Sequence, residues 1–168
     1  AETHVDRSIH IGSRDFVLTN TLGVQTLLDA ERQLGTIKRH VQISTDEVYG
    51  SLELGDTRQF DENWPFQPNV PYAAAKAGGD LLCRAFYKTF GSDVVVTHCS
   101  NNYGPYQFPE KLIPFFIDRA MNDESLPLYG DGKNVRDWLY VRDHCEAIDA
   151  VLHKGKAGEV YNIGGHFE

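Results

Sequence analysis

Short apolar runs alternate along this chain with longer segments of helical spacing, and this alternation constrains the fold more than any other feature. Residues 16–34 and 72–90 show helical periodicity, and each segment is followed by a glycine that can stop a helix. The runs at residues 41–44 and 94–97 are short, and the second is β-branched and apolar on both faces, as a central parallel strand should be. Strands and helices that alternate with short turns predict an α/β protein with a doubly wound parallel sheet.

The expected elements become shorter toward the C-terminus. Composition turns richer in Pro, Tyr and Gly after about Asn101, which indicates a second, smaller subdomain. Near the start of the chain, residues 4–8 read like the beginning of a helix with Asp6 as its cap. Further helices are predicted over residues 112–121 and 143–152, and short strands over residues 126–129, 138–141 and 160–163.

Bulk properties narrow the classes of function. The net charge of −8 argues against nucleic acid as a partner, because phosphate backbones are bound by basic faces. No apolar run approaches the length of a membrane span, so no membrane is expected as a partner. Three widely spread cysteines favour the reducing cytoplasm, and zinc or EF-hand spacings are absent from the sequence, so no metal is expected. A chain that starts inside a motif, without methionine, is expected to be an internal piece of a longer protein.

A hydroxyl and two adjacent carboxylates, on Thr45, Asp46 and Glu47, stand where the strand at residues 41–44 ends. Ligands bind at the strand ends of α/β sheets, so these side chains are candidates for a site. Two carboxylates in a loop are most often only solvated, but their position directly after a buried strand favours a functional role. Neighbouring carboxylates push their pKa values apart, which allows one to act as an acid and the other as a base.

Tyr72 and Lys76 are four residues apart in the predicted helix at residues 72–90, so their side chains share one face. A lysine ammonium beside a phenol lowers the pKa of the phenol, and a phenolate can accept a proton from a sugar hydroxyl. The pattern alone is weak, because Tyr129 and Lys133 repeat it. Two glycines between that second pair disfavour a helix, so Tyr129 is interpreted as a turn or ligand-stacking residue.

Polar residues in the C-terminal half add candidates for ligand contacts. Asn101 and Asn102 follow the strand that begins at Val94, and their amides can hydrogen-bond a cofactor or a sugar; ordinary turn chemistry explains them equally well. Lys111 and Arg136 could each bind a phosphate, with a surface ion pair as the alternative for either residue.

Taken together, these motifs resemble the extended short-chain dehydrogenase/reductase family, and within it the dTDP-glucose 4,6-dehydratases. The resemblance covers essentially the whole chain. Its discriminating part is Thr45-Asp46-Glu47, since nucleotide-sugar epimerases typically lack the paired acids here, whereas Tyr72 with Lys76 marks only the superfamily. The matching segments are residues 1–9, 44–50, 72–76, 99–105, 110–114, 129–132, 136–141 and 161–166.

The resemblance implies an incomplete Rossmann-like fold. Residues 1–103 would be the C-terminal part of the NAD-binding domain, and residues 104–168 part of the nucleotide-sugar-binding region, interleaved with it. It also implies a tightly held NAD that is reduced and reoxidised within one turnover. The implied reaction converts dTDP-glucose into the 4-keto-6-deoxy sugar by C4 oxidation, loss of water across C5 and C6, and hydride return to C6. Members of the family are generally homodimers.

By the same resemblance, Tyr72 removes the proton of the sugar 4-hydroxyl while Thr45 bonds the 4-oxygen, and Lys76 keeps Tyr72 ionised. Glu47 takes the C5 proton, and Asp46 protonates the departing C6 hydroxyl. The residues implied to contact NAD are Thr19, Tyr72, Lys76 and Asn102. Those implied to contact the nucleotide sugar are Thr3, Thr45, Asn101, Lys111, Leu112, Pro127, Tyr129, Arg136 and Asn162.

The sequence departs from the family in two respects. Thr3 stands where the family often has serine, which preserves the hydroxyl. No G-x-x-G-x-x-G turn, which would cradle the pyrophosphate of NAD, occurs in the sequence. Two alternatives to a dTDP-glucose dehydratase therefore stay open: a related dehydratase or epimerase of a UDP- or CDP-sugar, and an inactive piece that acts only as a binding module.

Overall fold

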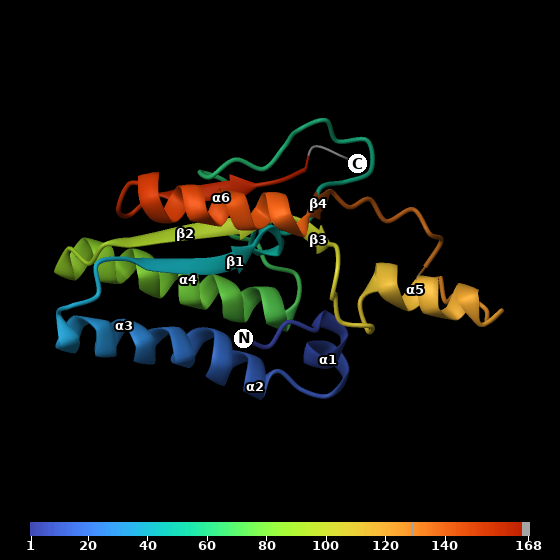
Figure 1. Ribbon diagram of the computed structural model, residues 1–168, viewed down its shortest axis with the longest axis horizontal. Helices are drawn as coiled ribbons and strands as arrows, with labels where there is room; N and C mark the ends of the chain where they lie inside the picture. The colour runs from blue at the N-terminus through green and yellow to red at the C-terminus, as the bar shows by residue number, and fades with distance from the viewer. Residues whose placement is uncertain (129, 166–168) are drawn as a thin grey trace.

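A three-stranded parallel sheet frames the structure, a computed structural model that describes residues 1–128 and 130–165. Its strands are β1 (His40–Thr45), β2 (Val94–Cys99) and β5 (Val160–Ile163), in the order β1-β2-β5 (Figure 1). A second parallel pair joins β3 (Asn101–Tyr103) to β4 (Trp138–Tyr140). All the strand pairs in the described part of the chain are thus parallel, as the sequence predicts for an α/β protein.

Helices cover both faces of the three-stranded sheet. On one face α4 (Pro71–Phe90) packs on β1 and β2, and α3 (Gly23–Leu34) packs on α4. On the other face α6 (Val141–Lys154) packs on β2 and β5, so that three layers result (Figure 1). The predicted doubly wound α/β class is confirmed. The main apolar cluster fills the α3–α4 side and consists of Val24, Leu28, Cys83, Phe86, Val94 and Val96.

One long helix precedes β1 and contains an irregular turn. It starts as α2 (Arg14–Val17), passes through a π-helical turn η1 (Leu18–Leu22) and continues as α3. The helix ends where Gly35 adopts a left-handed backbone with φ +64°, and α4 ends in the same way at Gly91 with φ +69°. The apolar periodicity and the terminal glycines therefore predicted both helices correctly, whereas nothing in the periodicity predicted the π-helical turn.

Most of the later elements also lie where the sequence placed them, but two expectations were wrong. The described residues 126–128 form no strand; all three are exposed, and Pro127 lacks the N–H that strand pairing needs. Tyr129 lies outside the described residues. Helix α1 (Val5–His10) is capped by His4, whose ring nitrogen accepts from the Arg7 amide at 3.4 Å, while Asp6 lies inside the first turn.

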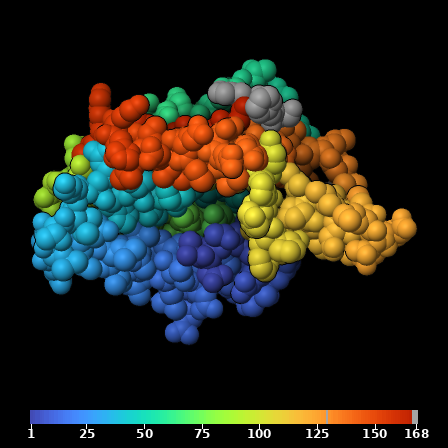
Figure 2. Space-filling view, viewed as in Figure 1, coloured from blue at the N-terminus to red at the C-terminus, as the bar shows by residue number. Residues whose placement is uncertain are grey.

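Helix α5 (Leu112–Met121) stands apart from the three layers. It contains no buried residue, and the space-filling view shows residues of this region projecting from one end of the body (Figure 2). Within the described ranges, no helix is both long and apolar enough to cross a membrane.

Candidate active site

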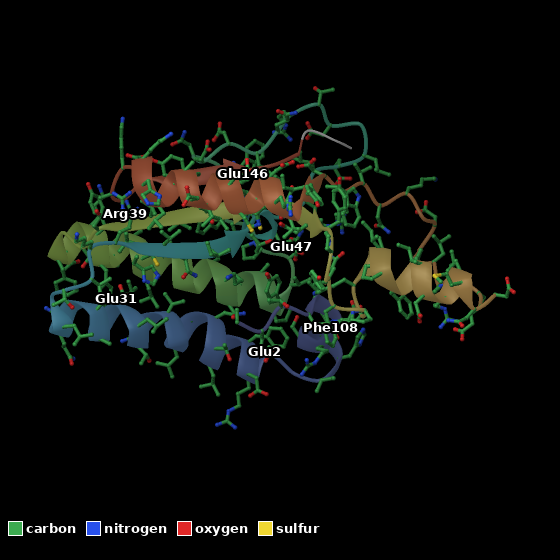
Figure 3. The ribbon with its side chains drawn as sticks, in the orientation of Figure 1. Glu2, Glu31, Arg39, Glu47, Phe108 and Glu146 are labelled. Atoms are coloured by element: carbon green, nitrogen blue, oxygen red, sulfur yellow. The ribbon has the colours of Figure 1, made fainter. Side chains whose placement is uncertain are left out.

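Both acids stand on a single 3-10 turn, η2 (Asp46–Tyr49), which begins directly after β1. Thr45 caps this turn: its Oγ1 accepts from the Glu47 amide at 3.3 Å and donates to Asp46 Oδ1 at 3.2 Å. The turn ends at Gly50 with φ +95°, where an added Cβ would lie 2.6 Å from the Gln67 carbonyl oxygen. The segment expected to be a loop is therefore a short, capped turn that holds the acids at the strand end (Figure 3). We call η2, Asp46–Tyr49, the acid turn.

Burial makes both carboxyl groups weaker acids. It raises the pKa of Asp46, against a hydrogen bond from Thr45 that lowers it. Burial likewise raises the pKa of Glu47, and the Asp46 carboxylate raises it further. The Arg136 guanidinium attracts both carboxylates and lowers both pKa values. Carboxyl groups with raised pKa values can take up and release protons nearer neutral pH than solvated ones.

Tyr72 lies in the first turn of α4 and points toward the acid turn. It is 8% exposed, its backbone amide donates to Ser8 Oγ at 3.3 Å, and its ring packs edge-on against Phe16. Burial, followed by the Glu47 carboxylate, raises the pKa of Tyr72, and a hydrogen bond between the Thr45 and Tyr72 side chains lowers it. Thr45, Asp46, Glu47 and Tyr72 thus form one cluster.

Lys76 is bound differently from the expectation. Its ammonium donates to the Ile43 carbonyl, and burial lowers its pKa while Asp80 raises it. Burial and the nearby carboxylates raise the pKa of Tyr72, and the lowering of this pKa by Lys76 stays a prediction. Lys76 and Thr19 both line an open pocket of about 550 Å³ beside β1.

The two asparagines occupy the short strand β3. Asn102 Nδ2 donates to the Ser100 carbonyl at 3.0 Å, and Asn102 Oδ1 lies 2.7 Å from Nδ1 of the buried His144 ring. The backbone amide of Asn101 donates to the Asp137 carbonyl at 3.2 Å. Both asparagines therefore lie at the end of β2, as predicted, but the side chain of Asn102 is already engaged within the protein.

The basic candidates lie near the acid turn. Lys111 Nζ donates to the carbonyl of Thr3 at 3.0 Å, and its charge lowers the pKa of Glu47, as that of Arg136 does. Leu112 and Pro127 are exposed on the α5 side of the molecule. Asn162 lies on β5, where its amide bonds Tyr49 and the Phe60 carbonyl.

Sequence reasoning missed a buried polar chain behind the acid turn. It runs through Ser44, Asp80, His98 and Tyr49, and it reaches the predicted site only at Asn162. The available signal in the sequence was a polar residue near the end of each of three strands: Ser44 in β1, His98 in β2 and Asn162 in β5. Among the described residues, no group of three or more His, Cys, Asp or Glu side chains is arranged to hold a metal ion.

Comparison with known proteins yields close relatives. The family model described as GDP-mannose 4,6 dehydratase matches residues 1–168. A dTDP-glucose 4,6-dehydratase of Actinoplanes sp. is 55% identical over 168 residues, which are 100% of this chain and 51% of that protein. The chain spans about half the length of the curated relatives it matches.

Solved structures agree with this comparison. A double mutant of DesIV, a dTDP-glucose 4,6-dehydratase from Streptomyces venezuelae with NAD and DAU bound, gives a TM-score of 0.95 at 52% identity, over 99% of this chain and 50% of that one. A UDP-glucuronic acid 4-epimerase from Bacillus cereus, in complex with UDP-glucuronic acid and NAD, gives 0.90 at 31% identity, over 99% and 52% of the two chains.

Proposed function

The chain belongs to the GDP-mannose 4,6 dehydratase family, and on that premise we propose that the complete protein dehydrates dTDP-glucose with the help of NAD. The product is the 4-keto-6-deoxy sugar. The observation that carries the proposal is the acid turn, because two partly buried carboxyl groups with raised pKa values stand beside Tyr72. An epimerase needs one group to remove the 4-hydroxyl proton. A dehydratase also needs a base at C5 and an acid at the C6 hydroxyl.

Tyr72 and Thr45 handle the 4-hydroxyl in this proposal. Tyr72 accepts the hydroxyl proton, and Thr45, whose side chain lies close to Tyr72, holds the 4-oxygen. Burial and the Glu47 carboxylate favour the neutral phenol of Tyr72, so in this proposal the positive charges of Lys76 and of bound NAD must favour the phenolate before Tyr72 can act as a base. Lys76, one helical turn after Tyr72 in α4, joins this helix to β1 through its bond to the Ile43 carbonyl.

Glu47 and Asp46 divide the elimination between them. Glu47 takes the proton at C5, where the adjacent 4-ketone has made it acidic, and its raised pKa makes the carboxylate a stronger base. Asp46 gives its proton to the departing C6 hydroxyl, and burial favours the protonated form that this requires. Two adjacent carboxyl groups in one buried turn can share a single proton, which matches one base and one acid.

The residues around the open pocket fit a dinucleotide. Thr19 and Lys76 line the pocket. Tyr72 and Asn102, which do not line it, complete the set of proposed NAD contacts. When bound, NAD accepts hydride from C4 and returns it to C6. The chain's own contribution is to hold the two acids directly after β1, with Tyr72 close to them.

Cationic and polar residues near the acid turn suit a nucleotide diphosphate. Lys111 and Arg136 already act on the acid turn electrostatically, and each can bind phosphate oxygens. The proposed contacts with the nucleotide sugar are Thr3, Thr45, Asn101, Lys111, Leu112, Pro127, Arg136 and Asn162, together with Tyr129 outside the described residues.

The proposal extends to organisation and location. Residues 1–103 would supply the cofactor side and the catalytic groups, and residues 104–168 part of the nucleotide-sugar side. A homodimer is supported by large apolar side chains that stay exposed on the long helix and on α4, including Leu22 and Leu81. Three free cysteines fit the reducing cytoplasm.

The test is the reaction itself. The complete protein, incubated with NAD and dTDP-glucose, is expected to give a sugar nucleotide that has lost one water and absorbs as a 4-ketone in alkali. UDP-glucose and CDP-glucose, assayed in parallel, are expected to react more slowly. A product of unchanged mass and inverted C4 configuration would assign an epimerase instead, and no reaction with any of the three would leave the binding-module alternative.

A further inference from the structure

A row of polar side chains crosses the sheet one residue before the site. The parallel register pairs Ser44 of β1 with His98 of β2, and His98 with Asn162 of β5. His98 is only 1% exposed and Ser44 only 4%, so the row lies in the interior of the protein. Buried polar groups need hydrogen-bond partners, since an unpaired one costs roughly 1–3 kcal/mol.

The partners come from α4 and from the acid turn. Asp80 of α4 accepts from Ser44 Oγ at 2.6 Å, and the same oxygen lies 3.2 Å from His98 Nε2. Tyr49, the last residue of the acid turn, has its hydroxyl 2.6 Å from His98 Nδ1 and donates to Asn162 Oδ1 at 2.8 Å. An unbroken chain of hydrogen bonds therefore links α4, all three strands and the acid turn.

The orientation of Asn162 fixes the direction of the bonds. Its Nδ2 donates to the Phe60 carbonyl at 3.1 Å, so its Oδ1 faces Tyr49 and accepts. Tyr49 has a single hydroxyl proton, which it gives to Asn162, and burial raises the pKa of Tyr49, so that this proton stays in place. The Tyr49 oxygen must then accept from His98 Nδ1–H. On the other side His98 Nε2 lies 3.2 Å from Asp80 Oδ2, the oxygen that accepts from Ser44, so with Asp80 as a carboxylate both ring nitrogens act as donors.

We propose that His98, which bridges Asp80 and Tyr49 as a double donor, is the positioning residue of the acid turn; the proposal rests on the dehydratase function proposed above. His98 touches no reacting group. It acts through Tyr49, whose ring is 1% exposed and packs against Phe60, Phe66 and the His98 ring. Tyr49 and the two acids belong to the same four-residue turn, so a shift of Tyr49 moves both carboxyl groups.

The geometry predicts a selective loss of elimination. In the complete protein, Tyr49→Phe keeps the packed ring but removes the acceptor of His98 and the donor to Asn162. The kcat for dehydration is expected to fall about 10- to 100-fold, the effect of misplacing catalytic groups by about 1 Å. The KM for dTDP-glucose is expected to stay within about 2-fold, and bound NADH should accumulate, because oxidation at C4 depends on Tyr72 and not on the acids.

Two further variants complete the kinetic test. Tyr161→Phe is the matched control: it removes a hydroxyl from the same strand as Asn162, one that accepts from the Lys156 amide at 2.8 Å, and its kcat should equal that of the wild type. His98→Gln cannot donate to both partners, so it should lower kcat as Tyr49→Phe does. The double variant should lose little more than either single one, since both break the same chain. An unchanged kcat in Tyr49→Phe overturns the proposal.

A second measurement does not depend on activity. In the wild-type protein labelled with ¹⁵N-histidine, NMR should show both ring nitrogens of His98 protonated, and Tyr49→Phe should change the Nδ1 signal while the signals of the exposed His10 and His153 stay unchanged. A single protonated nitrogen in the folded wild type overturns the proposal. If the wild type dehydrates no sugar nucleotide but His98 carries both protons, the proposed function fails, and the positioning of catalytic acids fails with it, while the assigned bonding of His98 stands.

Discussion

At the scale of single residues, the two adjacent acids differ in their surroundings. Asp46 receives a hydrogen bond from the Thr45 hydroxyl, whereas Glu47 has its backbone amide bound by that hydroxyl and its carboxyl group near Lys111. The same 3-10 turn therefore gives two neighbouring carboxyl groups separate environments. Separate environments are what a pair needs if one member is to act as a base and the other as an acid.

Asp46→Asn and Glu47→Gln should fail at different steps in the complete protein. With Asp46→Asn, oxidation at C4 continues and the C5 proton still exchanges with D₂O through Glu47, but elimination is slow, so a 4-keto hexose and NADH accumulate. With Glu47→Gln, oxidation continues and C5 exchange is largely lost. The neutral amides are nearly isosteric with the acids, so the losses report proton transfer. Mass spectrometry of sugar recovered from D₂O measures the exchange; equal exchange in both variants would contradict the assigned roles.

The pKa of Tyr72 should respond to the carboxylates more than to Lys76. Removing the negative charge in Glu47→Gln favours the phenolate, so the pKa of Tyr72 should fall. Lys76→Met should change it less in the absence of NAD, because the ammonium of Lys76 is directed to the Ile43 carbonyl. Phenolate absorbance during a pH titration, with Tyr72→Phe subtracted as the blank, measures the shift. A larger shift in Lys76→Met would restore the simple pairing of Tyr72 with Lys76.

At the scale of secondary structure, two glycines allow α4 to approach the long helix. Gly79 lies so close to it that an added Cβ would be 2.6 Å from the Asn20 carbonyl oxygen, and a Cβ at Gly78 would be 3.0 Å from Thr21 Oγ1. Asn20 also bonds both backbone groups of Glu2. The close approach thus joins α4, the π-helical turn and the start of the chain into one packed unit.

Gly79→Ala should therefore overpack this contact and lower the free energy of unfolding by roughly 1–3 kcal/mol. Gly23→Ala is the matched control on the facing helix. Its added Cβ meets only the Leu18 carbonyl oxygen at an ordinary 3.6 Å, and alanine favours a helix by roughly 0.5–1 kcal/mol over glycine. Urea denaturation of the complete protein compares the two. Equal free energies of unfolding for Gly79→Ala and the wild type would mean that α4 and the long helix can move apart without loss of stability.

Local signals in the sequence predicted helices better than they predicted strand pairing. The helices at residues 16–34 and 72–90 follow from apolar spacing and terminal glycines, and the helix at residues 112–121 was predicted without such a glycine; these signals act over a few residues. Strand β3 was missed because its partner β4 lies more than 30 residues further along the chain. Residue type and position in the sequence were enough to predict that Thr45, Asp46, Glu47 and Tyr72 lie together, as the structure has them. The bonding of Lys76 and His98 depends on residues from other elements, which a linear pattern does not bring together.

At the scale of the whole molecule, the chain presents its proposed catalytic groups together with an open pocket that we propose as part of the NAD site. The pocket is lined by Thr19 and Lys76, but the sequence contains no glycine-rich turn for a pyrophosphate. Backbone N–H groups at such a turn supply much of the binding of a dinucleotide. The 168-residue chain by itself should therefore bind NAD with a Kd weaker than about 1 μM. Calorimetric titration measures this affinity, and a tighter Kd would show that the pocket suffices without the turn.

Helix α5 has no buried residue. Lys111, the residue at its N-terminus, donates a hydrogen bond to the carbonyl of Thr3, which is distant in the sequence. Helices with so few packing contacts open locally at little free-energy cost, and their backbone amides exchange with solvent deuterium early. The amides of α4, which are covered on several sides, should exchange late. Because Lys111 and Leu112 are proposed contacts of the nucleotide sugar, slower exchange in α5 on addition of dTDP-glucose would record substrate binding at a distance from the reacting carbons.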